Sequence, residues 1–252
     1  MKIALLSDIH ANRQALDACL QHARAQGAEQ FALLGDLVGY GGEPVAVVEQ
    51  VMALVQRGAL CVLGNHDALA LEPPASPRNR GELGARWTHD RLSQAHHAFL
   101  QSLPLTARLG QSALLVHASA DAPEQWRYVE DGNAAERSMT AAQAIDPAIR
   151  YVFGGHVHAQ ALYFLTPTAK LMRFAPEPGV PVPVPTHRQW LAIAGSVGQP
   201  RDGDARAMYA LFDDAAKQIT FYRVPYDHLA AAAAIRAAGL PAFYADRLEH
   251  GQ

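Results

Sequence analysis

The first 63 residues alternate short apolar runs with helical patterns, and this alternation constrains the fold more than any other feature. Apolar runs at residues 2–6, 31–34 and 60–63 have the length of buried strands. Between them, residues 11–26 and 44–57 repeat apolar side chains at helical spacing. Strands joined by crossover helices run parallel and form a sheet that helices cover. We therefore expect an α/β fold with ligands bound at the carboxyl ends of these strands.

Polar side chains able to bind a metal follow each of the three predicted strands. Asp8 and His10 come after the first strand, Asp36 after the second and Asn65 after the third. The same arrangement recurs where two later apolar runs end in histidine: His117, His156 and His158. Because the carboxyl ends of neighbouring parallel strands meet at one edge of a sheet, we expect these side chains to lie close together.

The second half of the chain is richer in strand patterns. We expect strands at residues 105–109, 113–116, 151–153, 162–165, 171–174, 189–194, 208–212 and 219–224. A long helical pattern at 82–100 lies within residues 72–102, a candidate helical lid. The Pro-rich residues 175–187 cannot supply central-strand hydrogen bonds and are expected to form a surface loop. Residues 226–250 predict two helices, and no composition shift divides residues 1–252 into more than one domain.

Composition excludes several classes of protein. With 50% hydrophobic and 18% charged residues the chain is neither disordered nor a disulfide scaffold. Its two cysteines, Cys19 and Cys61, lie in apolar patterns and are expected to be reduced core thiols in a cytoplasmic protein. The formal net charge of −3 argues against nucleic acid as a partner. No apolar run approaches the about 20 residues of a membrane span. The sequence does not indicate an oligomeric state.

The seven strand-end residues offer oxygen and nitrogen donors and no thiolate. Such a set suits two borderline divalent ions, and Mn, Fe, Ni or Zn fit it better than Ca. His156 and His158 are two residues apart in an extended segment, so their side chains share one face. The glycines before them allow the backbone to turn sharply. The sequence therefore predicts a metal centre.

These motifs, in this order, resemble the calcineurin-like metallophosphoesterase superfamily. The resemblance rests on five segments: Asp8-x-His10, Gly35-Asp36, Gly64-Asn65-His66-Asp67, His117 and Gly155-His156-x-His158. Longer strings at residues 7–12, 35–41 and 195–203 are similar to a prokaryotic branch of small phosphodiesterases. The resemblance implies a four-layer α/β/β/α sandwich of two mixed sheets flanked by helices, with the metal site at strand carboxyl ends.

The resemblance also implies how the ligands divide between two divalent ions, with manganese favoured. One ion would be bound by Asp8, His10 and His158, the second by Asn65, His117 and His156, and Asp36 would bridge them. Two such ions bring four positive charges, of which the two carboxylates cancel two. A phosphoryl group fits the surplus, and a hydroxide bridging the ions would attack it in line. The expected activity is hydrolysis of small phosphodiesters, with phosphomonoesters as further substrates.

His66 is the candidate acid for the leaving group. It follows the ligand Asn65 directly, and Asp67 would orient its imidazole. The alternative is a residue at a helix start that is hydrogen-bonded to Asp67. Replacing His66 by alanine separates the two roles, because a catalytic acid can be lost without loss of metal.

Two further residues are candidate substrate contacts. Asn12 either meets the substrate or caps the following helix. Arg201 either meets a phosphate or pairs with Asp202. Two positions depart from the branch: Ala11 and Ala118 stand where glycine is common, and each adds a methyl group near the site without removing a ligand.

Two other functions remain open. The first is a protein or nucleotide phosphomonoesterase. The segment after Asp36 lacks the Asp-Arg-Gly string whose arginine binds phosphate in protein phosphatases of this superfamily, which disfavours a protein phosphatase. The alternative of another class is a binding scaffold that keeps the fold without catalysis. Retention of His66 and of every ligand position argues against the scaffold.

Overall fold

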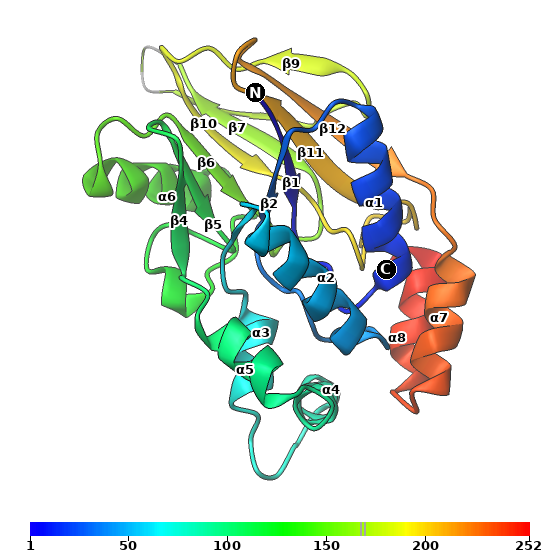
Figure 1. Cartoon of the computed structure of the whole chain (residues 1–252). Helices are drawn as coiled ribbons and strands as arrows, with labels where there is room; N and C mark the ends of the chain where they lie inside the picture. Colours follow the sequence, from blue (N-terminus) through cyan, green and yellow to red (C-terminus); the bar gives the residue numbers. More distant parts are fainter. Residues whose placement is uncertain (167, 169) are drawn as a thin grey trace.

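The computed structural model describes residues 1–166, 168 and 170–252, and these form two six-stranded mixed sheets (Figure 1). The first sheet has the order β3-β2-β1-β11-β12-β9. Its strands are β1 (Lys2–Leu6), β2 (Gln30–Leu33), β3 (Leu60–Cys61), β9 (Pro181–Pro183), β11 (Ala207–Asp213) and β12 (Gln218–Val224). The second has the order β4-β5-β6-β10-β7-β8. Its strands are β4 (Thr106–Leu109), β5 (Ala113–Val116), β6 (Tyr151–Gly154), β7 (Ala161–Leu165), β8 (Leu171–Phe174) and β10 (Gln189–Ile193).

An apolar core lies between the two sheets. Leu5 of β1, Phe212 of β11 and Phe153 of β6 belong to it, and the rings of Phe153 and Phe212 have centroids 5.1 Å apart. Successive side chains of a strand point to opposite faces, so Ala4 and Leu6 pack on the other side of β1, against helices. Burial of both faces explains why this strand is apolar from Ile3 to Leu6.

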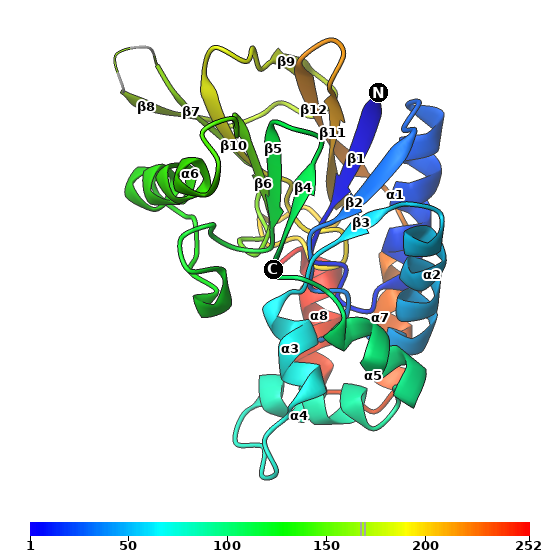
Figure 2. The same ribbon diagram turned by 60° about the vertical axis from the view of Figure 1, so that its left-hand side comes forward.

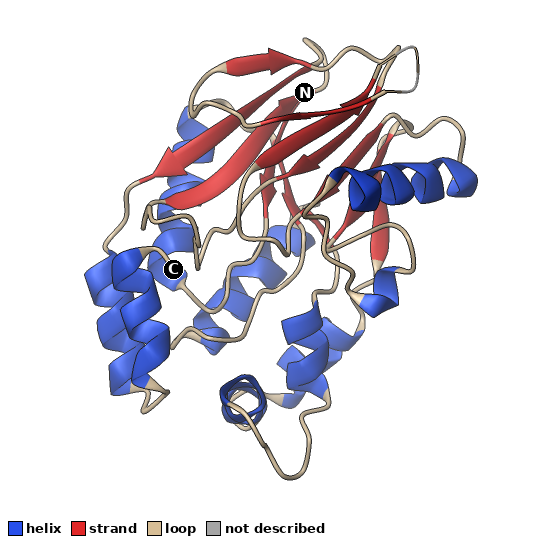
Figure 3. Cartoon of the chain, turned by 180° about the vertical axis from the view of Figure 1, so that it is seen from behind, coloured by secondary structure: helices blue, strands red, loops and turns tan. Residues whose placement is uncertain are grey.

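The helices either cover the outer face of a sheet or lie beyond the ends of its strands (Figures 2 and 3). They are α1 (Arg13–Ala25), α2 (Pro44–Gln56), α3 (Asn65–Leu71), α4 (Arg80–His89), α5 (Gln94–Gln101), α6 (Gly132–Ile145), α7 (His228–Ala237) and α8 (Ala242–His250). Helices α1 and α2 pack on the first sheet, and α6 packs on the second. The order helix, sheet, sheet, helix confirms the predicted four-layer sandwich.

Parallel strand pairing positions the functional residues. Strands β1, β2 and β3 run parallel to one another, and so do β5, β6 and β10 of the second sheet. The loops after β1, β2, β5 and β6 therefore leave their sheets at the same end of the molecule. This end lies above α3, α4 and α5 in Figure 2.

Three predicted elements differ from the structure. The helical pattern at residues 82–100 is divided into α4 and α5, because Ser93 accepts a hydrogen bond from His96 N and begins a new helix. Of the strand predicted at residues 60–63, only Leu60–Cys61 pairs with β2. The Pro-rich residues 175–187 are not loop throughout: β9 pairs with β12 at the edge of the first sheet, and an edge tolerates proline.

The candidate lid at residues 72–102 contains α4 and α5. It is docked onto the C-terminal helices, since Trp87 Nε1 donates a hydrogen bond to Ala238 O at 3.1 Å. Its closure over a substrate stays a prediction. Both cysteines are free and buried, Cys19 with no exposed surface, which confirms their prediction as core thiols. Among the residues described, no helix has the length and apolar character needed to span a membrane.

Candidate metal centre

Backbone turns at the strand ends aim the predicted ligands inward. Asp8 and Asp36 both have φ of 53°, and His156 and His158 have φ of 68° and 61°. This left-handed conformation is unfavourable for residues with a side chain and persists only where surrounding contacts enforce it. At Gly155 the chain passes very close to the end of β1, because a Cβ at this position would overlap the side chains of Ser7 and Asp8. The strain is therefore located where the donors converge.

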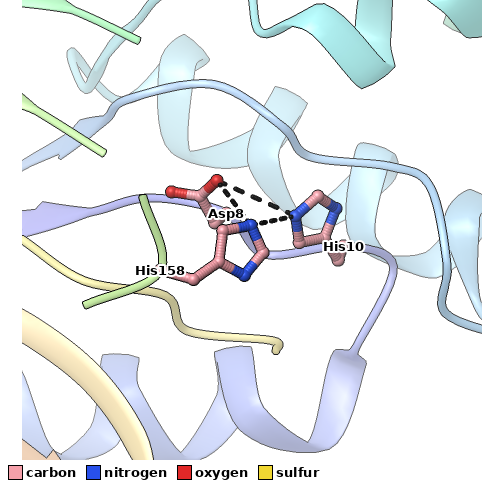
Figure 4. Close-up of side chains that lie close together, drawn as sticks. All are labelled: Asp8, His10 and His158. Carbon is pink, nitrogen blue, oxygen red and sulfur yellow. Dashed lines mark hydrogen bonds and ion pairs between the residues drawn. The ribbon is translucent and has the colours of Figure 1, made fainter. Parts of the chain in front are cut away.

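The first triad consists of Asp8, His10 and His158, whose candidate ligand atoms all lie within 4.8 Å of one another (Figure 4). His158 Nε2 lies 3.2 Å from Asp8 Oδ1 and 3.1 Å from His10 Nε2. All three side chains are buried. The predicted first ligand set is thus brought together from the ends of β1 and β6.

Hydrogen bonds on the far side of each ring indicate which nitrogen faces the centre of this triad. His10 Nδ1 lies 3.1 Å from Val38 O, and His158 Nδ1 lies 2.6 Å from Gln199 O. A carbonyl oxygen only accepts, so both Nδ1 atoms donate and both Nε2 atoms carry lone pairs. Two lone pairs at 3.1 Å repel each other, and buried Asp8 Oδ1 has no hydrogen-bond partner among the described residues. A divalent cation satisfies all three atoms, so these residues fit a metal.

The second triad consists of Asp36, His117 and His156. His117 Nδ1 donates to Leu34 O at 2.8 Å, which turns its Nε2 toward the centre. This Nε2 lies 3.0 Å from Asn65 Oδ1 and 3.2 Å from His156 Nδ1. Asn65 therefore joins the triad, as the sequence predicts for the second ion.

Asp36 stands between the two triads. Its Oδ2 lies 3.4 Å from His117 Nε2 and 3.8 Å from His10 Nε2. Its Oδ1 accepts a hydrogen bond from His66 N at 2.8 Å, which fixes the carboxylate. Asp8 is held in the same way, since its Oδ2 accepts from His156 N at 2.8 Å. One carboxylate oxygen thus faces histidines of both sets, which is the position that a bridging ligand requires.

The electrostatics of the site favour positive charge. Burial alone would raise the pKa of Asp36, but His117 and His66 outweigh it and hold that pKa well below its usual value. Burial opposes a charged imidazole at His117, yet Asp36 raises the pKa of His117 to about 9. Burial and the neighbouring His158 keep the pKa of His10 well below its usual value, which leaves that ring neutral. The centre thus contains ionised carboxylates and retains a proton where a cation would bind.

The structure places His66 beside the first triad and gives Asp67 a role different from the predicted one. The half-buried His66 ring has its centroid 5.1 Å from that of His10 and 4.3 Å from that of Tyr40. Asp67 accepts hydrogen bonds from Val38 N at 3.1 Å and Gly64 N at 3.0 Å. No hydrogen bond joins it to the His66 imidazole in the described part of the chain. Asp67 therefore fixes the loops around the site, and the prediction that it orients His66 is wrong.

Asn12 serves as a helix cap rather than as a free substrate contact. Its Oδ1 accepts from Ala15 N at 3.1 Å, which confirms the capping alternative. Its Nδ2 donates to Gly198 O at 2.9 Å and to Tyr226 Oη at 3.1 Å. The side chain is buried and both of its polar atoms form hydrogen bonds within the protein, so Asn12 is not free to contact a substrate as expected.

Arg201 lies near the first triad without a carboxylate partner in the described residues. Its Nη2 donates to Gln199 Oε1 at 2.8 Å, and its guanidinium carbon lies 5.8 Å from the centroid of the Tyr40 ring. Asp202 pairs with Arg223 instead, so the predicted Arg201–Asp202 pair is wrong. Contact of Arg201 with a substrate phosphate stays a prediction.

Aromatic side chains flank both triads: Tyr40 follows a ligand segment and is a candidate neighbour of the site from the sequence, whereas Tyr128 is not. The Tyr40 ring lies 4.7 Å from that of His10. On the opposite flank, Tyr128 stacks on His156 with centroids 3.9 Å apart. Tyr128 lies in a loop without regular spacing, where the only available signal is an aromatic residue shortly after a strand-end histidine.

The sequence and the fold have counterparts among known proteins. Residues 1–217 match the calcineurin-like phosphoesterase superfamily domain. An uncharacterized protein of Methanocaldococcus jannaschii is 31% identical over 258 residues, which cover 99% of this chain and 98% of that protein. The crystal structure of a metallophosphoesterase from Sphaerobacter thermophilus is 33% identical with a TM-score of 0.85, over 100% of this chain and 99% of that one. A hypothetical protein from Pyrococcus horikoshii shares the fold at 19% identity with a TM-score of 0.77, over 100% of this chain and 98% of its own.

Proposed function

This chain belongs to the calcineurin-like phosphoesterase superfamily, and we propose that it is a two-metal hydrolase of small phosphodiesters. The observation that carries the proposal is the place of Asp36, whose Oδ2 lies 3.4 Å from a histidine of one triad and 3.8 Å from a histidine of the other. A carboxylate shared by two donor sets suits two ions held close together.

We propose that the donors divide between the two ions as the family resemblance implies. One ion would be held by Asp8, His10 and His158, the second by Asn65, His117 and His156, and both by Asp36. When bound, the ions would supply Lewis acidity and lower the pKa of a coordinated water. Nitrogen and oxygen donors suit Mn, Fe, Ni or Zn, and we propose manganese as the first ion to test.

The residues around the triads then act on the substrate. With two dicationic metals the two carboxylates leave about two positive charges, which attract the phosphoryl group. His66, beside His10, would donate a proton to the leaving oxygen. Arg201, beside Tyr40, would neutralise a charged oxygen of the substrate.

Diesters are favoured over monoesters by the residues that follow Asp36. Tyr40 occupies this segment and packs on His66, and no arginine is present there. A monoester dianion needs more cationic contacts than a diester monoanion. A segment that supplies an aromatic ring and no cation therefore supports a diester as the substrate.

We also propose that residues 1–252 form a single domain that works in the cytoplasm. The buried free thiols of Cys19 and Cys61 support a reducing compartment.

Hydrolysis of bis-p-nitrophenyl phosphate and p-nitrophenyl phosphate tests the proposal. Chelated protein would receive Mn, Fe, Ni, Zn or Mg, each alone. We expect metal-dependent turnover with a higher kcat/KM for the diester. Metal binding without turnover of either ester would support the scaffold, and a higher kcat/KM for the monoester would support a phosphomonoesterase. Arg57→Gln is a suitable control, because it removes one exposed charge remote from the triads.

A further inference from the structure

Tyr128 combines an exposed ring with a direct contact to a proposed ligand. Its ring stacks on His156 with centroids 3.9 Å apart and planes 26° apart. Tyr128 is nevertheless 50% exposed. One face of the ring thus lies on the imidazole, and the rest of the ring remains open to solvent beside the second triad. Trp126 of the same loop lies edge-on to His117, with centroids 5.9 Å apart.

The loop that carries Tyr128 is strained and anchored. Trp126 has φ of 52°, a conformation rarely adopted by a bulky residue. Arg127 forms an ion pair with Asp121, and Val129 is buried in the core beneath α6. Strain of this kind persists only where surrounding contacts enforce it, and it concentrates at sites that bind ligands. The anchored neighbours on both sides hold the Tyr128 ring in place.

Burial of apolar surface does not explain why the Tyr128 ring lies next to the second triad. The hydrophobic effect stabilises a side chain in proportion to the apolar area that is removed from water, and Tyr128 keeps half of its surface in water. On the opposite flank, Tyr40 already packs against His10, His66 and Tyr244. Tyr128 therefore offers an accessible aromatic face next to the second triad.

We propose that Tyr128 stacks on a planar ring of the substrate, so that the phosphodiesters hydrolysed by this protein carry a nucleobase or another aryl group. The inference rests on the proposed function, because it requires a phosphoryl group bound between the triads with its substituent on the flank of His156. Aromatic side chains accept bases by stacking, with little dependence on which base is present. The recognised class is thus the nucleotide-type phosphoester.

Equilibrium binding of two probes to the manganese-loaded protein tests the inference. AMP and ribose 5-phosphate share the phosphate and the ribose, and differ by the adenine ring. Isothermal titration should show that AMP binds at least about fivefold more tightly, which is the lower end of base stacking on an aromatic side chain. Tyr128→Ala should abolish this preference, and Tyr128→Phe should retain it. Phe174→Ala removes another exposed ring, on β8, and should leave the preference unchanged.

Each contrary outcome has its own signature. Equal affinity of the unmodified protein for the two probes would overturn the inference. A Tyr128→Ala protein that loses metal, and affinity for both probes by the same factor, would show that the ring only positions His156. Failure of the proposed function looks different, because no ester would be hydrolysed with any metal while the AMP preference would still be measurable.

Discussion

Replacing His66 tests whether this residue donates a proton to the leaving group. Its ring is 5.1 Å from that of His10, whereas its backbone N–H holds Asp36 Oδ1 at 2.8 Å. His66→Gln removes the imidazole and keeps that backbone bond, so the metal ligands should stay in place. Loss of a general acid lowers turnover by about 10²- to 10⁴-fold, which corresponds to about 3–5 kcal/mol of barrier.

The assay compares diesters whose leaving groups differ in basicity. A p-nitrophenolate departs without protonation, so its release should be slowed only slightly in His66→Gln. An alkoxide needs the proton, so an alkyl leaving group should show the full loss. Metal content, measured by plasma mass spectrometry, should remain at about two ions per chain. An equal loss for both leaving groups, or a loss of metal together with activity, would refute the assignment of His66 as the acid.

Three further variants probe the backbone and the caps around the site. Gly155→Ala should lose thermal stability and bound metal, because the new Cβ would overlap Ser7 Oγ and Asp8 Oδ2; an unchanged Tm and metal content would contradict the close packing. Asn12→Ala should lower the free energy of unfolding by about 1–3 kcal/mol, since a helix cap and two buried hydrogen bonds are lost, while KM stays unchanged. A raised KM at unchanged stability would restore Asn12 as a substrate contact. Ala11→Gly should raise the free energy of unfolding by up to about 1 kcal/mol in denaturant titration, because Ala11 has φ of 51°, and a lowered value would show that the turn is unstrained.

The positions of the metal donors could be predicted because parallel topology converts sequence order into spatial order. Each donor segment follows an apolar run, and the ends of parallel runs meet at one end of the fold. Asp8 and Asp36 follow β1 and β2, which pair in parallel, and His117 and His156 follow β5 and β6, which do the same. Each motif spans only a few consecutive residues, so it can be recognised without knowing which distant residues contact it.

The roles of the polar residues around these donors could not be predicted in the same way. Asp67 is adjacent to His66 in sequence, but its carboxylate accepts from backbone N–H groups of Val38 and Gly64. Arg201 precedes Asp202, yet Asp202 pairs with Arg223 across the fold. Neighbours in sequence point in different directions on a helix, as His66 and Asp67 do in α3, and often in loops, so adjacency gives little information about side-chain partners.

Some elements carry too weak a pattern to be predicted. Helix α6 buries mostly alanine, with Met139 as its one large buried apolar side chain. Its buried face is therefore hardly more hydrophobic than its exposed face, and the helical period is weak. Helix α3 has only seven residues and begins inside a ligand motif. Tyr128 is exposed and lies in a loop, so neither period nor hydrophobicity distinguishes it from an ordinary surface residue.

Electron paramagnetic resonance of the protein loaded with two equivalents of Mn²⁺ detects whether two ions share a bridging ligand, and so tests the role of Asp36. A carboxylate of Asp36 shared by both ions predicts an exchange-coupled pair of Mn²⁺ ions, and this coupling should be lost in Asp36→Asn because the carboxylate between the triads is removed. A spectrum of isolated Mn²⁺ ions in the unmodified protein, or coupling that survives Asp36→Asn, would contradict it.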